Sequence, residues 1–368
     1  MRVRTLSLEE FRGYEHLSLE LSGGITAFVG PNGVGKTNLL EAVHLIARGD
    51  SPRAHDDSEL IRWGAPLARV GVRVARAEDE RRVEILLFNA ADGERRRPRR
   101  YLVNGAGKRV EDALGEATVV AFFPEDVELL TAAPAVRRRY LDAMVGQVDR
   151  AHRASTREYA RVLEQRNALL RALRDGESTE AEMAFWDVEL CRLAALISSA
   201  RIAAIAQLVR PFGEAMTRFS GADDLALAYL GQVEGTTSGE REPGYRALVR
   251  EKAERERWQG TSLVGPHRED LGVSAQGRAL GTFASRGEQR SAVLALKVAE
   301  AAWLRDQRGE SPIFLLDDVL SELDPDRREA LISSIPLDAQ ALLTAAVPAS
   351  LPRQLVERAT TVRVPFGP

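Results

Sequence analysis

Alternating hydrophobic and polar residues at the start of the chain predict two short β-strands. The first runs from Val3 to Phe11, and the second covers residues 17–21. A third run, Ile25 to Val29, is continuously apolar and leads directly into a glycine-rich segment. Apolar residues recur at helical spacing from Leu39 to Ile46. The pattern therefore predicts a strand, a glycine-rich loop and a helix in succession.

More strands are expected over residues 68–123. Apolar alternation or short apolar runs occur at 70–74, 83–88 and 118–123. The run at 101–103 precedes an Asn-Gly pair, which is typical of a tight hairpin turn. This part of the chain is therefore predicted to be rich in β-structure.

From about residue 136 the hydrophobic period changes to that of amphipathic helices. This period continues to about residue 257, so the whole stretch is expected to be helical. An Asp-Gly pair at 175–176 and a polar run at 231–244 interrupt it, which favours antiparallel helices over one long coiled coil. A further helix is expected at 289–304.

Strands return near the end of the chain, at Pro312–Leu316 and Ala341–Ala345. The 368 residues suit two domains, or one large fold with an insertion. We expect residues 1–134 and 258–368 to form an α/β head, with mixed β-sheets around the helix that follows the glycine-rich loop. Residues 135–257 are expected to form a mainly helical lobe inserted into this head.

The composition, with 44% hydrophobic and 29% charged residues, is that of a folded globular protein. The longest apolar runs are too short to cross a membrane, and the start of the chain lacks the apolar segment of a signal peptide. The net charge of −3 provides no overall attraction to nucleic acid or to anionic lipid. The single cysteine, Cys191, excludes an internal disulfide. A cytoplasmic protein without a membrane partner is therefore expected.

The glycine-rich segment fits a phosphate-binding loop of the type GxxxxGK[ST]. In such a loop, backbone N–H groups surround the phosphates and the helix directs its positive end toward them. Lys36 is expected to neutralise the β- and γ-phosphates, and the Thr37 hydroxyl to bind Mg²⁺. The residues expected to bind ATP here are Gly30, Pro31, Asn32, Gly33, Val34, Gly35, Lys36, Thr37 and Asn38.

Two aspartates follow the apolar strand at 313–316. Asp317 is expected to hold Mg²⁺ together with Thr37, and Asp318 to orient or activate the attacking water. Upstream lies Ser285-Arg286-Gly287-Glu288-Gln289-Arg290, in which a serine and a glycine open a helix. Such a helix start is a second candidate anion site, although the same string alone is also typical of a plain helix cap.

The ordered set of glycine-rich loop, Ser-x-Gly-Glu-Gln, Leu-Leu-Asp-Asp and Ser321-Glu322-Leu323-Asp324 resembles the ATP-binding-cassette superfamily. That resemblance implies a cassette-type P-loop ATPase head. It also implies a head-to-tail homodimer formed around ATP, in which Ser285, Gly287 and Gln289 reach the nucleotide of the partner subunit.

The Asp-Asp pair, and the segment from Leu6 to Tyr14, narrow this likeness to the RecF family. RecF proteins are DNA repair and recombination-mediator ATPases of bacteria, related to the heads of structural-maintenance-of-chromosomes (SMC) proteins. Further similar segments extend over the whole chain and are 123–127, 137–142, 159–170 and 265–270.

The RecF resemblance implies a weak, DNA-stimulated ATPase that acts in recombinational repair and replication. ATP-driven dimerisation would clamp double-stranded DNA near single-strand gaps, without sequence preference, and help to load recombinase; slow hydrolysis would release the DNA. RecR and RecO are the implied protein partners. Arg12 would approach the ATP phosphates. Glu125 stands where cassette proteins often carry a glutamine, and Thr344 where transporters carry a histidine, which suits slow hydrolysis.

Three arginine-rich regions are candidates for contacts with DNA phosphates: Arg95–Arg100, Lys108-Arg109 and Arg137–Arg174. The sequence does not choose among them, because 47 of the 51 basic residues are arginines and such clusters are also typical of solvated faces. No base-reading motif is recognisable, so affinity for DNA is expected to fall as salt rises. His267 is expected to be a turn or packing residue rather than a catalyst.

Other function classes share some of these motifs. The cytosolic ATPase subunit of a membrane transporter would have the same loop, signature and aspartates, but normally also the histidine and a shorter helical insertion. A monomeric P-loop kinase would transfer phosphate to a small metabolite and would not dimerise with ATP. A scaffold with a decayed ATP site is the third alternative, against which the intact lysine, threonine and aspartates argue.

Overall fold

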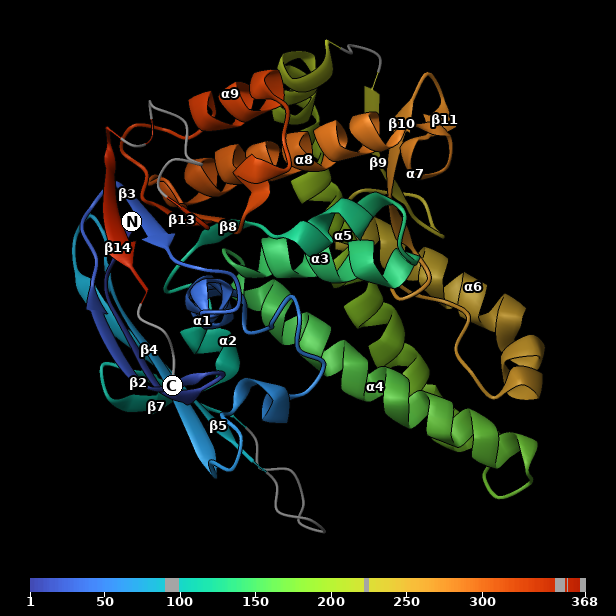
Figure 1. Cartoon of the computed structure of the whole chain (residues 1–368). Coiled ribbons are helices and arrows are strands. Elements are labelled where there is room, and N and C mark those ends of the chain that lie inside the picture. Colours follow the sequence, from blue (N-terminus) through green and yellow to red (C-terminus); the bar gives the residue numbers. More distant parts are fainter. Residues whose placement is uncertain (90–98, 222–224, 348–354, 356, 365–368) are drawn as a thin grey trace. The chain divides into compact units, whose positions relative to one another are not determined.

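The computed structural model describes residues 1–89, 99–221, 225–347, 355 and 357–364 (Figure 1). The chain divides into two compact units. The first unit comprises Met1–Val127, Glu214–Gly221 and Arg290–Pro368, and the second comprises Glu128–Gly213 and Ala222–Gln289. By their contacts, residues 258–289, expected in the head, belong to the second unit.

A six-stranded antiparallel sheet forms one side of the first unit, with strand order β2-β1-β4-β5-β6-β7. The predicted opening hairpin is confirmed, because β1 and β2 pair with Leu8 opposite Leu17. The Asn104-Gly105 turn is confirmed too, since both residues have a positive φ, 51° and 79°. The strands are β1 Arg2–Phe11, β2 Tyr14–Glu20, β4 Leu67–Ala75, β5 Glu80–Phe88, β6 Arg100–Val103 and β7 Ala106–Lys108.

A five-stranded parallel sheet forms the other layer of this unit, with strand order β14-β3-β13-β12-β8. Every residue of β3, β8, β12 and β13 is buried, as expected for a parallel sheet covered on both faces. The residues predicted to bind metal and phosphate lie where these strands end, which is where open parallel sheets usually bind ligands. The strands are β3 Ile25–Val29, β8 Val119–Phe122, β12 Ile313–Leu316, β13 Ala341–Ala345 and β14 Ala359–Arg363.

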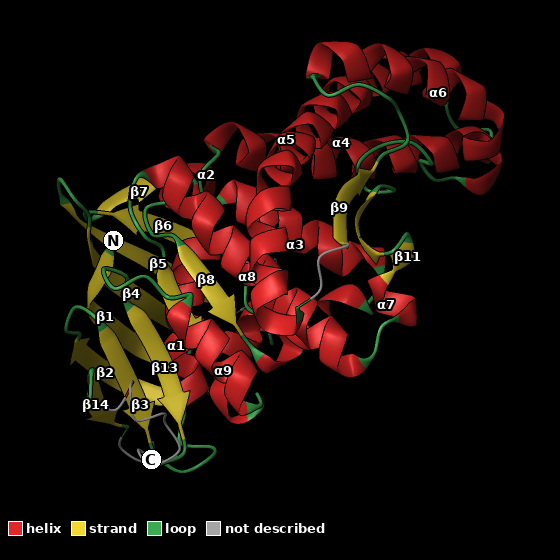
Figure 2. Ribbon diagram, turned by 90° about the horizontal axis from the view of Figure 1, so that it is seen from above, coloured by secondary structure: helices red, strands yellow, loops and turns green. Residues whose placement is uncertain are grey.

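Helix α1, Lys36–Arg48, contacts strands of both sheets (Figure 2). Every residue from Leu39 to Ala47 is buried, so α1 is covered on all sides and fixed between the layers. The remaining elements of this unit are short, apart from α8; the first turn of α8 and the end of η2 belong to the second unit. They are η1 Asp57–Leu60, α2 Val110–Ala113, η2 Pro124–Leu130, α8 Arg286–Arg308, η3 Val319–Ser321 and α9 Pro325–Ser333.

The second unit is mainly helical, as predicted, and α4 packs along α6 (Figure 2). Its core includes Tyr159, Leu190, Leu193 and Tyr245. Its helices are α3 Pro134–Gly146, α4 Arg150–Arg174, most of α5 Glu180–Ser220, α6 Ser238–Gln259 and α7 Leu280–Phe283. None of the helices in the described part of the chain is long and apolar enough to span a membrane.

The expectation of helices between residues 136 and 257, outside the two interruptions, is wrong at β9, Leu225–Leu230. This segment pairs with β10, Asp270–Ala275, which in turn pairs with β11, Arg278–Ala279. A six-residue apolar run is compatible with either a helix or a strand, and here the pairing with β10 decides. The interruption at 175–176 is confirmed, because α4 ends at Arg174.

The polar run at 231–244 is only partly an interruption, since α6 begins within it. Thr237 caps this helix: its side chain accepts a hydrogen bond from the Glu240 N–H, and the Glu240 carboxylate accepts one from the Thr237 N–H. This reciprocal pair stabilises a helix start even though Pro243 and Gly244 follow. The predicted interruption rested on polarity alone, which does not distinguish a loop from the polar first turn of a helix.

Candidate functional site

The glycine-rich loop lies between β3 and α1, as predicted. Gly33 and Gly35 have φ values of 83° and 97°, in the left-handed region that favours glycine. Space also requires glycine at 35, because a Cβ there would lie 2.8 Å from the Tyr14 hydroxyl oxygen. Burial raises the pKa of Tyr14 to about 12, so its hydroxyl stays protonated and donates to the Gly35 carbonyl at 3.1 Å. Tyr14 thus holds the loop against the antiparallel sheet.

The Lys36 ammonium also belongs to the loop. Its Nζ donates to the carbonyl oxygens of Gly30 at 2.6 Å and Pro31 at 2.9 Å, across the mouth of the loop. Lys36 is the first residue of α1, so its positive charge and the unpaired N–H groups of that helix start face the same place. This arrangement suits a polyphosphate.

Asp317 meets Thr37 at the carboxyl edge of the parallel sheet, as the sequence predicts. The Thr37 hydroxyl donates to Asp317 Oδ1 at 2.9 Å, and the Thr344 hydroxyl donates to the same oxygen at 2.8 Å. Asp317 is only 4% exposed. Burial raises the pKa of Asp317, although the hydrogen bonds from Thr344 and Thr37 oppose this shift. The carboxylate and the Thr37 hydroxyl thus form a fixed pair of oxygen ligands.

These oxygens fit Mg²⁺ carried by nucleotide phosphates. Magnesium in such sites is held by few protein oxygens and completes its shell with phosphate oxygens and water. Among the described residues no cluster of three or more His, Cys, Asp or Glu side chains suits a metal ion. Thr37 and Asp317 are therefore the candidate protein ligands for a metal that arrives with a nucleotide.

Asp318 differs from Asp317 in being exposed to solvent. Its backbone has a φ of 52°, which is uncommon outside glycine. The Asp318 N–H donates to Thr344 Oγ1 at 2.9 Å, and the Ser321 hydroxyl lies 3.0 Å from Asp318 Oδ1. An exposed carboxylate next to a candidate metal ligand is placed to bind a water molecule.

Arg12 lies in the turn between β1 and β2 and is held in place by Glu41 of α1. Arg12 Nε and Nη2 donate to the two Glu41 carboxylate oxygens at 2.9 and 2.7 Å, and Nη1 donates to the Glu59 carbonyl at 2.8 Å. Glu41 is fully buried. Burial alone would raise its pKa, but hydrogen bonds from Arg12 and Ser51 and the charge of Arg53 lower the pKa below its usual value. Arg12 is therefore a fixed cation close to α1.

A second arginine at this place, Arg53, was not identified from the sequence. Its Nη2 donates to Glu41 Oε2 at 2.7 Å and to Asn38 Oδ1 at 2.8 Å. Its positive charge also favours the ionised forms of Asp317 and Glu125. Arg53 belongs to no motif. The only signal in the sequence is its position soon after the helix that follows the glycine-rich loop.

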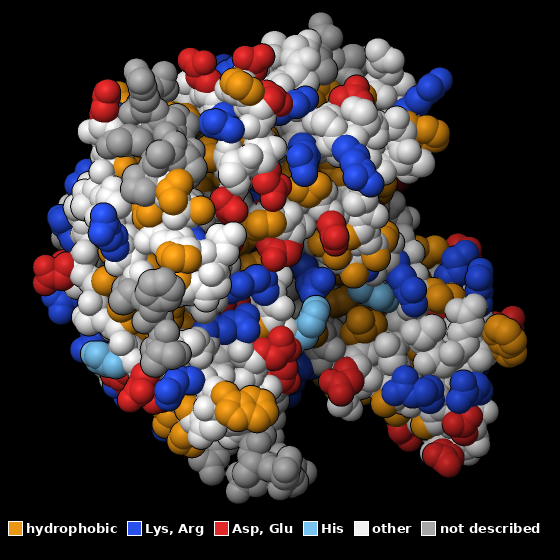
Figure 3. Space-filling model, viewed as in Figure 1, with side chains coloured by type: hydrophobic (Ala, Val, Ile, Leu, Met, Phe, Trp, Pro, Cys, Tyr) orange, Lys and Arg blue, Asp and Glu red, His pale blue; other side chains and the backbone are white. Residues whose placement is uncertain are grey.

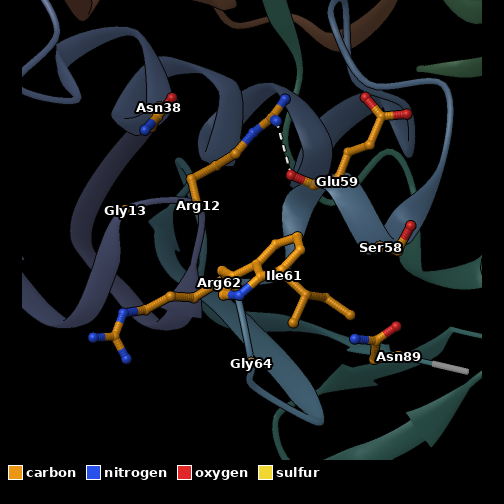
Figure 4. A pocket seen from close by; sticks show the side chains of 10 residues that line it. Arg12, Gly13, Asn38, Ser58, Glu59, Ile61, Arg62, Gly64 and Asn89 are labelled. Carbon is orange, nitrogen blue, oxygen red and sulfur yellow. Dashed lines mark hydrogen bonds between the residues drawn. The ribbon is translucent and has the colours of Figure 1, made fainter. Parts of the chain in front are cut away.

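A cavity of about 800 Å³ opens beside Arg12 and Asn38 (Figure 4). Figure 4 shows Arg12 pointing to the Glu59 carbonyl, with Ile61 and Asn89 across the cavity. Its volume suits a nucleoside-sized ligand. The residues that line it are Arg12, Gly13, Asn38, Ser58, Glu59, Ile61, Arg62, Trp63, Gly64 and Asn89.

The Ser-x-Gly-Glu-Gln string opens α8, and its residues 285–289 belong to the second unit, whereas Lys36 and Asp317 belong to the first. Ser285 and Glu288 form a reciprocal helix cap, because the Ser285 N–H donates to the Glu288 carboxylate at 2.7 Å and the Glu288 N–H donates to the Ser285 hydroxyl at 3.3 Å. Gln289 Nε2 lies within 3.4 Å of three carbonyl oxygens of the preceding segment, those of Leu280, Gly281 and Ala284. The contact of Ser285, Gly287 and Gln289 with a partner's nucleotide stays a prediction.

Glu125 lies at the start of η2, at the surface but with its carboxyl group partly shielded by neighbouring groups. Partial burial raises its pKa, and the nearby Asp317 carboxylate adds to this shift. The next residue, Asp126, pairs with Lys297 Nζ of α8 at 2.8 Å and accepts from the Phe123 N–H at 2.8 Å. The segment that carries Glu125 is thus tied to α8.

The structure reduces the number of arginines available to DNA. Arg99 pairs with Asp57 at 2.5 Å, and Arg137 pairs with Asp270 at 2.6 Å. Arg166 is buried. Residues 95–98 of the first arginine-rich region lie outside the described residues, whereas Lys108 and Arg109 are exposed. Basic and acidic side chains are interspersed on the face shown in Figure 3.

His267 is a packing residue, consistent with the expectation. Tyr159 Oη lies 2.6 Å from Nδ1, and Nε2 lies 3.1 Å from the Ser262 carbonyl oxygen. A carbonyl only accepts, so Nε2 carries the proton and Nδ1 accepts from Tyr159. Burial, together with the charges of Arg268 and Arg138, lowers the pKa of His267 to about 4.

Replacing His267 with glutamine is expected to reduce the loss of stability on acidification. The unfolded chain takes up this proton near pH 6.5, but the folded protein takes it up only near pH 4. The unfolded state therefore binds more protons between these values, and stability contributed at neutral pH is lost as pH falls from 6.5 toward 4, by up to about 3 kcal/mol. Urea unfolding at pH 7 and pH 4.5 measures this loss. An equal loss in both proteins would contradict the prediction; the exposed His16→Gln is the control.

Comparison with known proteins agrees with the RecF likeness over the whole chain. The family model described as RecF/RecN/SMC N terminal domain matches residues 2–351. The DNA replication and repair protein RecF of Roseiflexus castenholzii is 38% identical over 389 residues, covering 100% of this chain and 99% of that protein. The same-named protein of Chloroflexus aurantiacus is 40% identical over 370 residues, covering 94% of this chain and 93% of that protein.

Solved structures agree as well. One described as the recombination mediator protein RecF-ATP in the RecFOR pathway has a TM-score of 0.87 at 28% identity, covering 95% of this chain and 93% of that chain. A second, described as RecF-ATPrS, has a TM-score of 0.88 at 26% identity, covering 99% and 96%. An Smc head domain from Pyrococcus furiosus shares the fold, with a TM-score of 0.52 at 17% identity, covering 99% and 94%. The likeness inferred from the motifs is thereby confirmed, and this chain belongs to the RecF family.

Proposed function

We propose that this protein is a DNA-binding ATPase of recombinational repair and replication. The observation that carries the proposal is the hydrogen bond between Thr37 and Asp317, 2.9 Å long, which joins two motifs separated by 280 positions in the sequence. It brings the end of β12 to the glycine-rich loop, beside Lys36. The relatives' name, DNA replication and repair protein RecF, and the RecF-ATP structure support the same function.

The residues divide the chemistry as follows. The loop N–H groups and Lys36 bind the phosphates, and the cavity beside Arg12 and Asn38 receives the nucleoside. Magnesium, when bound at Thr37 and Asp317, neutralises phosphate charge. Arg12 is held by Glu41, so little entropy is lost when it stabilises charge on the transferred group. Asp318 orients the attacking water and accepts its proton.

The dimer and the DNA clamp are part of the proposal. ATP joins two copies head to tail, with Ser285, Gly287 and Gln289 of one copy facing the nucleotide of the other. The dimer holds duplex or gapped DNA without sequence preference, DNA stimulates the slow hydrolysis, and hydrolysis releases the DNA. RecR and RecO are the proposed partners, in the cytoplasm. The ATP-binding head is proposed to span residues 1–134 and 258–368 and the inserted lobe residues 135–257, although residues 258–289 make most of their contacts with the lobe.

Light scattering tests this proposal. The molar mass of the Asp318→Asn protein is expected to double with Mg-ATP and to rise again when duplex DNA is added. Lys36→Ala is expected to lose ATP binding and to stay a monomer, because the phosphates lose their neutralising charge. Ser285→Arg is expected to bind ATP but to remain a monomer. An unchanged mass despite bound ATP would refute the clamp and favour a monomeric P-loop enzyme, and ATP binding by Lys36→Ala would contradict the assigned site.

A further inference from the structure

The Thr344 hydroxyl lies between the two aspartates at the end of the parallel sheet. Strands β12 and β13 pair in parallel with Leu316 opposite Leu343, so the next residues along, Asp317 and Thr344, come side by side. Thr344 is 5% exposed, which excludes solvent from its contacts. The register of the sheet, rather than a loop, therefore sets the position of this hydroxyl.

A single oxygen atom contacts both aspartates. Thr344 Oγ1 donates its proton to Asp317 Oδ1 at 2.8 Å and accepts the Asp318 N–H at 2.9 Å. A hydroxyl has one proton to donate, so these two bonds fix its rotation. The Asp317 carboxylate and the Asp318 backbone are thereby connected through one side chain of a neighbouring strand.

The Asp318 backbone needs such support. Its φ of 52° is unfavourable for a residue with a side chain, and such a conformation persists only where the surroundings fix it. Its N–H bonds to Thr344, and its carbonyl oxygen accepts from the Ser321 hydroxyl at 2.7 Å and from the Ser321 N–H at 3.2 Å. Removing the Thr344 oxygen leaves the Asp318 N–H without its acceptor, so this end of the residue loses its support.

We propose that Thr344 is a positioning residue for ATP hydrolysis, which holds the metal-binding Asp317 and the water-binding Asp318 in register with each other. This inference rests on the proposed function, because it assigns to Thr344 the alignment of two groups that act in that reaction. In this proposal Thr344 acts through its bonds to the two aspartates and not by binding the phosphates or the water. Its loss is therefore expected to slow the chemical step without weakening nucleotide binding.

A matched set of variants tests the proposal. Thr344→Val keeps the shape and removes the hydroxyl; Thr344→Ser keeps the hydroxyl. Thr26→Val, in the neighbouring strand β3, is the control: Thr26 is 1% exposed and its hydroxyl has no hydrogen-bond partner among the described residues. Thr344→Val is expected to lower kcat by about a hundredfold at an unchanged KM for ATP. Thr344→Ser is expected to restore most of this loss, and Thr26→Val to leave kcat unchanged.

Amide hydrogen exchange in the nucleotide-free protein supplies a second readout, independent of turnover. The Asp318 N–H is expected to exchange faster in Thr344→Val than in the wild type, and to remain protected in Thr344→Ser and Thr26→Val. Thr344→Ala replaces Thr344→Val if the valine variant does not fold. Two results would overturn the proposal. One is a wild-type kcat in the variant that lacks the hydroxyl; the other is a loss of kcat in Thr344→Ser as large as that in Thr344→Val.

Failure of the proposed function gives a different result. If the wild-type protein bound ATP but did not hydrolyse it, with or without DNA, the ATPase assignment would be wrong, and the positioning role would fall with it. If the wild type hydrolysed ATP while Thr344→Val did so equally well with an unchanged Asp318 exchange rate, only the role of Thr344 would be refuted.

Discussion

Replacing Asp318 with asparagine is expected to slow ATP hydrolysis by about a hundredfold to ten-thousandfold, while ATP still binds. Asparagine keeps the shape of the side chain, and its backbone tolerates the positive φ of this position. It cannot accept the proton of the attacking water, however, so the chemical step loses its general base. Phosphate release under single-turnover conditions measures the loss, and a titration with fluorescent ATP measures binding.

Asp326→Asn is the matched control for that experiment. Asp326 is an exposed carboxylate in the first turn of α9 and is not part of the site. Its conversion to an amide changes the net charge by the same amount and is expected to leave hydrolysis unchanged. Hydrolysis at the wild-type rate in Asp318→Asn would show that another group orients the water, with Glu125 as the next carboxylate to test.

Replacing Arg166 with methionine is expected to destabilise the second unit by about 3–5 kcal/mol. Arg166 is 1% exposed, and its guanidinium donates to Glu256 at 2.6 Å, Ser262 at 2.7 Å and Asp187 at 2.8 Å. Glu256 is fully buried, so the substitution leaves its carboxylate without a balancing charge. Urea unfolding followed by the circular dichroism of the helices measures the change in the free energy of unfolding.

Two further variants identify the cause of that loss. Arg161→Met removes an exposed arginine of the same helix and is expected to change stability by less than about 0.5 kcal/mol. Adding Glu256→Gln to Arg166→Met is expected to recover part of the stability, because the buried charge is removed while an amide oxygen still accepts the Leu263 N–H. A loss below about 1 kcal/mol in Arg166→Met would show that the network contributes little.

The sequence was sufficient to predict the secondary structure where the local hydrophobic pattern and the local contacts agree. The predicted strands at 25–29 and 341–345 have the bounds of β3 and β13, and the glycine-rich loop lies between a strand and a helix as expected. In these places continuous apolar runs are buried on both faces, so burial and propensity favour the same structure. The contact between Thr37 and Asp317 was predictable for a different reason, namely the recognised order of motifs.

The parts that the sequence did not reveal depend on partners that are distant along the chain. β9 is a strand only because β10 pairs with it, 40 positions away at the pair Leu230 and Asp270. Nothing in the sequence distinguishes Arg53 and Glu41 from ordinary surface charges. In the structure the side chains of Arg12, Ser51 and Arg53 all contact the Glu41 carboxylate. The spacing of these residues along the sequence does not reveal this cluster, because the cluster follows from how α1 packs between two sheets.

The strand order of the parallel sheet has a consequence for the newly synthesised chain. β3 lies between β14 and β13, so the strand that precedes the phosphate-binding loop has both of its neighbours from the far end of the sequence. At translation rates of about 5–20 residues per second, roughly 15–60 s pass between the emergence of Thr37 and that of Asp317. The residues of the helical unit, 128–213 and 222–289, leave the ribosome in that interval. During it β3 has neither of its neighbouring strands, so its backbone N–H and C=O groups are open to pairing with wrong partners.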